Sequence, residues 1–242
     1  NYAADAILSG AEPIYVPLRP PDFGFDIEEL EAAFQKKPKA IVVCNPSNPS
    51  GKVFTREELL LIGRLAEQHD TFIIMDEVYE HIIYPPNQHV YAAALPGLED
   101  RVITCNSLSK TYSITGWRLG YVQAPPRIIE SARKVHDFLT VWAAAPLQEA
   151  AVTALNFPDS YYVDLQQLYA GKRALFLDIR REAGLTYSEP QGAYYVLVDL
   201  KDWGFASDRE AAEWFVEKVG AAGVPGSSFF RELVSSMIRF HF

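Results

Sequence analysis

The sequence predicts an α/β fold, a mainly parallel sheet with helices on both faces, followed by a smaller α+β part. Two observations lead to this prediction. Short β-rich runs alternate with helical stretches, and no hairpin signal joins one run to the next. Strands that are connected through a helix pair in parallel. The expected strands lie at residues 14–18, 41–44, 72–75, 102–105 and 119–124.

Two helices between these strands have readable starts. Asp26 precedes Glu29 by three residues, and Thr55 precedes Glu58 by the same spacing. In this arrangement the first side chain accepts from a free backbone N–H of the helix, and the glutamate accepts from the backbone N–H of the first residue. We therefore expect a reciprocal cap at each start.

The pattern changes after Pro158, where one long helical stretch replaces the strand and helix alternation. We expect a large domain at residues 1–160 and a smaller C-terminal domain at 161–242. Because the chain does not begin with Met and ends within a strand, we expect both domains to be incomplete. The elements expected in the second domain are an amphipathic helix at 161–182, a strand at 193–200, a helix capped by Ser207 with Glu210, and a strand at 238–242.

Composition argues against several kinds of partner. The formal net charge of −9 disfavours nucleic acid, which needs clustered Lys and Arg. No run of 18 apolar residues occurs, so no membrane span is expected. Cys44 and Cys105 are the only cysteines and form no Cys-x-x-Cys motif, which favours a reducing cytoplasm. The five histidines show no ligand spacing with cysteines or carboxylates, so we expect no metal.

Polar motifs follow the expected strands, at the edge where open α/β sheets bind ligands. Asn-Pro-Ser-Asn-Pro-Ser-Gly spans 45–51, and Asp76-Glu-Val-Tyr79 follows the next strand. Ser107-Leu-Ser109-Lys110 comes after the strand expected at 102–105, with Arg118 eight residues beyond the lysine. Each motif alone is more often a turn, a helix start or a solvated loop.

Together and in this order, the motifs resemble class I/II aminotransferases, the pyridoxal 5'-phosphate (PLP) enzymes of fold type I, across essentially the whole chain. The segments CNSLSKTYSITGWRLGYV and IRFHF resemble the branch of kynurenine, glutamine, methionine and aromatic aminotransferases. The resemblance implies PLP as cofactor and a homodimer with active sites at the subunit interface. It implies transfer of the amino group of a neutral or aromatic L-amino acid to a 2-oxo acid. It also implies that further residues precede Asn1.

The resemblance assigns roles to particular residues. Lys110 would form the Schiff base with PLP and carry a proton during the reaction. Asp76 would keep the pyridine nitrogen protonated. Asn48 and Tyr79 would donate to the phenolic oxygen, and Asn48 would also lie beside the substrate. The phosphate would be bound by Ser107, Ser109 and Arg118.

Arg239 belongs to the alternating segment Met237 to Phe242, which places it on the face opposite Ile238 and Phe240. An arginine inside such a strand needs an anion. The resemblance supplies the substrate α-carboxylate, bound by two parallel hydrogen bonds. The alternative is a structural ion pair.

Two other functions are compatible with these motifs. A carbon–sulfur β-lyase has the same fold and cofactor, because PLP performs the chemistry and the protein selects the bond that breaks. The fold also occurs as the effector-sensing domain of transcription regulators, behind a helix-turn-helix. The acidic balance of the chain favours an enzyme over a regulator.

Overall fold

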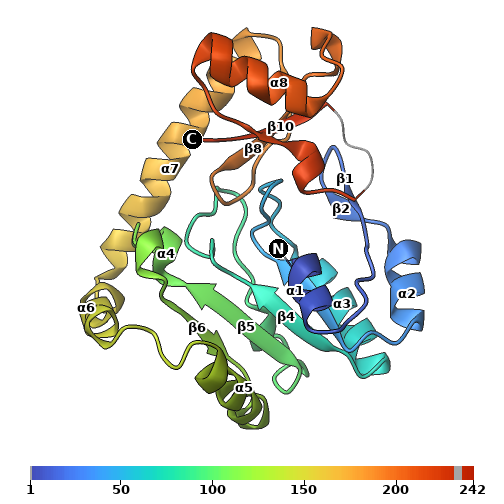
Figure 1. Cartoon of the computed structure of the whole chain (residues 1–242), viewed down its shortest axis with the longest axis vertical. Helices are drawn as coiled ribbons and strands as arrows, with labels where there is room; N and C mark the ends of the chain where they lie inside the picture. Colours follow the sequence, from blue (N-terminus) through green and yellow to red (C-terminus); the bar gives the residue numbers. More distant parts are fainter. Residues whose placement is uncertain (1, 232–235) are drawn as a thin grey trace.

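The computed structural model describes residues 2–231 and 236–242 of the chain. Its main sheet, one of two four-stranded sheets among these residues, has the strand order β3-β4-β5-β6 (Figure 1). The parallel strands are β3 (Ala40–Cys44), β4 (Phe72–Asp76) and β5 (Val102–Ser107), and β6 (Gly120–Gln123) runs antiparallel to β5. The prediction of an α/β fold with a mainly parallel sheet is confirmed.

One face of this sheet carries a hydrophobic core. Helices α2 (Ile27–Gln35) and α3 (Arg56–Gln68) pack there, with Leu30, Phe34, Leu59 and Ile62 at most 2% exposed. Side chains alternate between the two faces of a strand. In β4, Ile73 and Met75 therefore join this core, and Asp76 points to the other face, where it meets Tyr2 of α1 (Tyr2–Leu8).

The two helix starts are confirmed, but only one cap is reciprocal. Thr55 Oγ1 accepts from the Glu58 backbone N–H, and the Glu58 carboxylate accepts from the Thr55 backbone N–H. Asp26 caps α2 by accepting from Glu29 N–H at 3.0 Å. The Glu29 carboxylate instead binds the Arg19 guanidinium through two hydrogen bonds of 2.9 Å. A charged partner thus replaces the backbone group that the spacing predicts.

The strand expected at 14–18 is wrong. Only Leu18 is in a strand, β1 (Leu18–Arg19), which pairs with β2 (Gly24–Phe25). Pro13 and Pro17 bracket the apolar run, and proline cannot donate to a β ladder. Ile14 and Tyr15 are accordingly 37% and 45% exposed.

The second half of the chain builds another sheet, with the strand order β7-β8-β10-β9. The long helix α7 (Asp159–Glu182) runs beside it, close to the expected bounds (Figure 1). A second core packs here, containing Leu177, Val196, Val198 and Ile238. The strands are β7 (Thr186–Tyr187), β8 (Tyr195–Asp199), β9 (Val224–Pro225) and β10 (Met237–His241).

The remaining helices are short or lie outside the two cores. As expected, Ser207 caps α8 (Asp208–Trp214), accepting from Glu210 N–H at 3.2 Å. None of the described helices combines the length and apolar character that a membrane span requires. The other elements are α4 (Leu108–Thr111), α5 (Pro126–Leu139), α6 (Ala145–Leu155), the 3-10 turns η1 (Ala92–Ala94), η2 (Thr115–Trp117), η3 (Lys201–Trp203) and η5 (Gly226–Ser228), and the π-helical turn η4 (Phe215–Val219).

Candidate active site

The polar motifs lie where the three parallel strands end. Strands β3, β4 and β5 are in register, so that Cys44 pairs with Asp76 and Asp76 with Cys105. The segments that follow these residues therefore emerge from one edge of the sheet, where open α/β folds bind ligands. They contain Asn48, Tyr79 and Lys110, among the residues singled out from the sequence.

Asp76 is held by its neighbours at the end of β4. The Tyr2 hydroxyl donates a short hydrogen bond to Asp76 Oδ2, and the Val78 backbone N–H donates to Oδ1 at 3.2 Å. Burial raises the pKa of Tyr2, and the neighbouring thiol of Cys44 and carboxylate of Asp76 raise it further. Tyr2 is therefore a neutral donor near pH 7, and each carboxylate oxygen retains a lone pair for another donor.

Lys110 is half-buried in the short helix α4, directly after β5. Its Nζ lies 5.9 Å from the centre of the Tyr194 ring, a distance at which an ammonium is attracted to the aromatic face. No described carboxylate forms an ion pair with Lys110. This amine is thus oriented by packing and not neutralised by an acid.

A cluster of hydroxyl groups precedes Lys110. Ser107 caps α4, with its Oγ accepting from Ser109 N–H at 3.1 Å, and the two hydroxyl oxygens are 2.8 Å apart. Arg118 follows η2 in the left-handed backbone region, with φ of 56°. Its Nη1 donates to the Thr115 carbonyl at 3.0 Å, and Thr115 Oγ1 donates to the Ser109 carbonyl at 3.1 Å. Thr115 therefore links the exposed Arg118 to the serines.

Arg239 lies between two aromatic rings. Its guanidinium carbon is 4.3 Å from the centre of the Tyr195 ring and 4.6 Å from that of Phe229. Its Nη1 donates to Asn48 Oδ1 at 2.7 Å, and its buried Nε has no hydrogen-bond partner among the described residues. Arg239 forms no ion pair with a described carboxylate, so these residues do not support the structural alternative.

Tyr79 connects with the same aromatic group. Its hydroxyl is 2.8 Å from that of Tyr195, and both residues are buried, at 3% and 7% exposed. Burial raises the pKa of each hydroxyl, so both are protonated near pH 7. The Tyr79 ring also meets Tyr194 edge-on, with 5.3 Å between ring centres.

The structure therefore brings most of the expected site residues into contact. Lys110, Tyr79, Asn48 and Arg239 belong to one connected set, joined through the rings of Tyr194 and Tyr195. The second set contains Ser107, Ser109 and Arg118, and it adjoins the first because Lys110 follows Ser109 in α4. Asp76 is held separately, by Tyr2 and the Val78 backbone.

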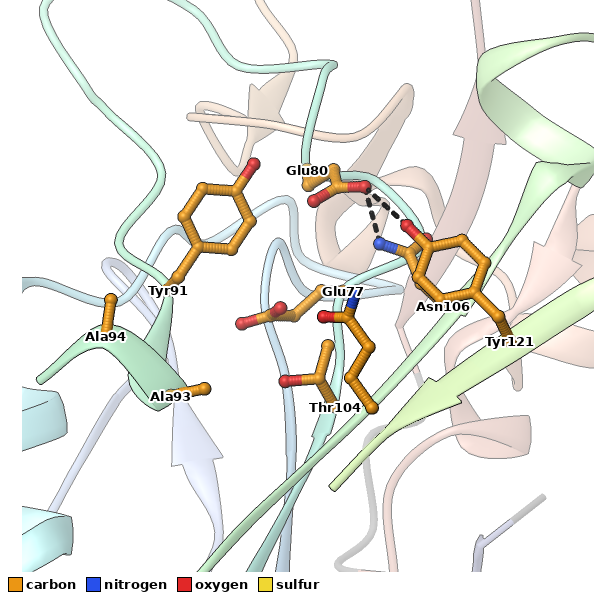
Figure 2. A pocket seen from close by; sticks show the side chains of 9 residues that line it. Glu77, Glu80, Tyr91, Ala93, Ala94, Thr104, Asn106 and Tyr121 are labelled. Atoms are coloured by element: carbon orange, nitrogen blue, oxygen red, sulfur yellow. Dashed lines mark hydrogen bonds between the residues drawn. The ribbon is translucent and has the colours of Figure 1, made fainter. Parts of the chain in front are cut away.

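A pocket of about 290 Å³ is lined by residues of β5 and β6, of the segment that follows β4, and of η1 (Figure 2). It is lined by Glu77, which is fully buried, and by Glu80, which accepts from Asn106 Nδ2 at 2.5 Å. One ligand-type atom from each of Glu77, Glu80 and His89 lies within 4.8 Å of the others. His89 Nε2 is 3.5 Å from Glu77 Oε1, and among the described residues neither His89 nitrogen nor either Glu77 carboxylate oxygen has a hydrogen-bond partner. The absence of a metal stays a prediction.

Comparison with known proteins identifies the family. The family model "Aminotransferase class I and II" matches residues 1–242. The chain belongs to this family. An aspartate aminotransferase of Pyrococcus abyssi is 37% identical over 232 residues, which are 95% of this chain and 59% of that relative. Kynurenine–oxoglutarate transaminase 3 of Rattus norvegicus is 34% identical over 248 residues, 92% of this chain and 55% of that relative.

Solved aminotransferases share the fold as well as the sequence. N-succinyldiaminopimelate aminotransferase of Mycobacterium tuberculosis superposes with a TM-score of 0.94 at 29% identity, covering 100% of this chain and 64% of that one. YbdL of Escherichia coli, for which a methionine aminotransferase function is described, gives 0.94 at 32% identity, covering 99% and 63%. The chain thus has fold type I of the PLP-dependent aminotransferases, and it spans little more than half the length of the curated relatives it matches.

Sequence reasoning gave no contact to two residues that the structure places in the candidate site. Tyr2 had no motif or periodic pattern around it, and only the fold brings it to Asp76. The family resemblance puts Tyr195 in the Gly192–Tyr195 turn, at the expected substrate entrance, but gives it no partner. Its contacts with Arg239 and Tyr79 depend on the pairing of β8 with β10, which no local pattern encodes.

Proposed function

We propose that this chain is the greater part of a PLP-dependent aminotransferase that moves the amino group of a neutral or aromatic L-amino acid to a 2-oxo acid. The observation that carries this proposal is Arg239, a guanidinium clamped between two rings with a buried, unpartnered Nε, in contact with the set that contains Lys110. A buried donor of this kind requires an acceptor. The α-carboxylate of an amino-acid substrate would provide this acceptor, in the same site as the Lys110 amine.

The donor set of the site fits PLP. The cofactor has a phosphate, a basic ring nitrogen, a phenolic oxygen and an aldehyde. Hydroxyls and a guanidinium suit the phosphate, a carboxylate suits the ring nitrogen, and an amine suits the aldehyde. The chain has these groups in Ser107, Ser109 and Arg118, in Asp76, and in Lys110. When bound, PLP supplies an electron sink for charge that develops at the substrate Cα.

Each residue then has a definite task. Lys110 Nζ would hold the aldehyde group of PLP and would carry the proton at the substrate Cα. The Asp76 carboxylate, fixed by Tyr2 and the Val78 N–H, would hold the proton on the ring nitrogen. Asn48 can donate through Nδ2 to the phenolic oxygen, because its Oδ1 is the atom that accepts from Arg239. Tyr79 donates to the same oxygen.

The test is a half-reaction screen of the full-length protein loaded with PLP. Single amino acids are added without an oxo acid, and the cofactor absorbance reports conversion to pyridoxamine phosphate. We expect conversion that a 2-oxo acid reverses. Release of ammonia and a thiol without pyridoxamine phosphate would show the β-lyase instead.

The proposal includes the organisation of the protein. Residues 1–160 would form most of the PLP-binding domain and residues 161–242 most of a smaller C-terminal domain. The first core lies within the first range, and the second core within the other. We place the enzyme in the cytoplasm, with amino acids and 2-oxo acids as small-molecule partners and no nucleic acid or membrane. The charge of −9 supports the absence of a nucleic-acid partner.

We expect neutral substrates to be preferred over aspartate. In dicarboxylate-specific relatives, a second arginine from the partner subunit meets the distal carboxylate, in a region that resembles residues 137–146 here. This segment contains no Arg or Lys. Desolvating a side-chain carboxylate without a counter-charge costs several kcal/mol, more than the ~1–3 kcal/mol from one apolar contact. We therefore expect kcat/KM for aspartate to be at least about tenfold below that for phenylalanine.

The measurement compares kcat/KM for aspartate, methionine, phenylalanine and glutamine with one fixed oxo acid. The names of the relatives do not decide the outcome, since they include an aspartate and a kynurenine aminotransferase. A clear advantage for aspartate would overturn the prediction.

The protein is expected to be a homodimer. Helix α5 has no buried residue, and an apolar run begins in its last turn, with Phe138 94% and Leu139 75% exposed. Family active sites lie at the subunit interface, and this run belongs to the segment assigned to it. Light scattering at assay concentration should show a dimer, which Phe138→Glu weakens. Leu175→Glu, at a 65% exposed position of α7, is the matched control. A fully active monomer would contradict this expectation.

A further inference from the structure

Tyr195 touches both ends of the candidate site with different parts of one side chain. Its ring face lies 4.3 Å from the guanidinium carbon of Arg239, and its hydroxyl lies 2.8 Å from that of Tyr79. We propose that Tyr195 is a positioning residue that aligns Arg239 for the substrate carboxylate and Tyr79 for the phenolic oxygen of the cofactor. This inference rests on the proposed function and assigns a residue that the motifs do not contain.

The register of the second sheet produces the ring contact. Strand β8 runs antiparallel to β10, with Leu197 opposite Arg239 and Tyr195 opposite His241. Directly paired residues share a face, so Tyr195 and Arg239 are diagonal neighbours on one side of the sheet. Long and aromatic side chains can touch across such a diagonal. The position of Tyr195 relative to Arg239 is therefore set by backbone pairing.

The rings on both sides restrict the guanidinium to one plane. Phe229 covers the face opposite Tyr195, at 4.6 Å, and the Nη1 bond to Asn48 sets the rotation within that plane. A planar fork binds a carboxylate through two parallel bonds only when its orientation is correct. The aromatic clamp thus fixes beforehand the orientation that binding requires, which lowers the entropic cost of binding.

The hydroxyl of Tyr195 contacts Tyr79, the residue proposed to donate to the phenolic oxygen of the cofactor. A phenol has a single proton, so when Tyr79 donates to another oxygen, the proton between Tyr79 and Tyr195 must come from Tyr195. Tyr195 then both fixes the position of Tyr79 and strengthens it as a donor. Tyr194 packs against both rings, at 5.3 Å from Tyr79 and 4.7 Å from Tyr195 between ring centres, and so confines the pair.

The two contacts can be separated by substitution in the PLP-loaded protein. Tyr195→Phe keeps the ring and removes the hydroxyl, whereas Phe229→Leu removes the other half of the clamp without touching Tyr79. Tyr195→Leu removes both contacts. The readouts are KM and kcat for one neutral amino acid, and the midpoint of the pH titration of the bound cofactor's absorbance.

We expect Tyr195→Phe and Phe229→Leu each to change a different readout. Tyr195→Phe should raise the titration midpoint by up to about one pH unit, because a weaker donor favours the deprotonated cofactor less, with KM nearly unchanged. Phe229→Leu should raise KM about 2- to 30-fold with an unchanged midpoint. Tyr195→Leu should show both effects.

Identical behaviour of Tyr195→Phe and wild type in both readouts, or an unchanged KM in Phe229→Leu, would overturn the proposal. If Tyr195→Leu does not fold, the other two variants still decide. Failure of the wild type to bind PLP would instead refute the proposed function.

Discussion

Replacement of Lys110 by alanine is expected to abolish the covalent link to PLP and to slow amino transfer by at least about 10²- to 10⁴-fold, the usual contribution of a positioned general base. The half-buried amine is held over the Tyr194 ring, directly after the serine pair. No described carboxylate forms an ion pair with Lys110, so its amine is available to react with the cofactor. Binding of PLP should persist more weakly, through the phosphate and ring contacts.

Borohydride reduction of the wild type, followed by peptide mapping, identifies the lysine that carries the pyridoxyl group. Single-turnover kinetics then measure the loss in Lys110→Ala. Lys172→Ala is the matched control, because Lys172 Nζ also lies over a tyrosine ring, Tyr169, at 5.1 Å, but lies outside the proposed site. A label on any other lysine, or equal loss in both variants, would refute the assignment.

The three parallel strands of the main sheet were predictable because each carries an apolar run that ends in a polar motif. The expected ranges 41–44, 72–75 and 102–105 match β3, β4 and β5 closely. The same criterion failed at 14–18, where Pro13 and Pro17 remove the donors that pairing needs. Local apolarity predicts a strand only when a partner can bond with it.

The residues of the candidate site also fall into two groups, those that local motifs indicate and those that only the fold brings in. Lys110, Asp76 and Asn48 stand in local motifs, so the sequence alone indicates them. Tyr2 and Tyr195 have no such signal, because their contacts join segments far apart in the chain: Tyr2 with Asp76, and Tyr195 with Tyr79. Long-range pairing is a property of the fold, and aromatic residues in an apolar run are ordinarily core. Sequence therefore predicted the groups with proposed chemical roles, and the structure added residues that contact them.

Arg239→Lys is expected to lower kcat/KM for every α-amino acid about 10- to 100-fold, with PLP affinity nearly unchanged. Lysine keeps the charge but loses the planar fork, so it cannot lie flat between Tyr195 and Phe229 or form two parallel bonds with a carboxylate. The loss should occur mainly in KM, because the fork binds the carboxylate before and during the reaction alike. PLP affinity is retained because the expected cofactor contacts involve Ser107, Asp76 and other residues.

The measurement pairs steady-state kinetics for several amino acids with a fluorescence titration of PLP. Arg180→Lys is a matched control, because the Arg180 guanidinium also contacts two aromatic rings, Phe176 at 4.3 Å and Phe240 at 4.6 Å. Burial there lowers the pKa of Arg180 to about 10, so Arg180 remains a cation near pH 7. We expect Arg180→Lys to leave KM unchanged, since Arg180 is remote from Asn48 and Lys110 in the contact network. If Arg239→Lys loses PLP while KM stays constant, then Arg239 supports the fold and another group binds the carboxylate.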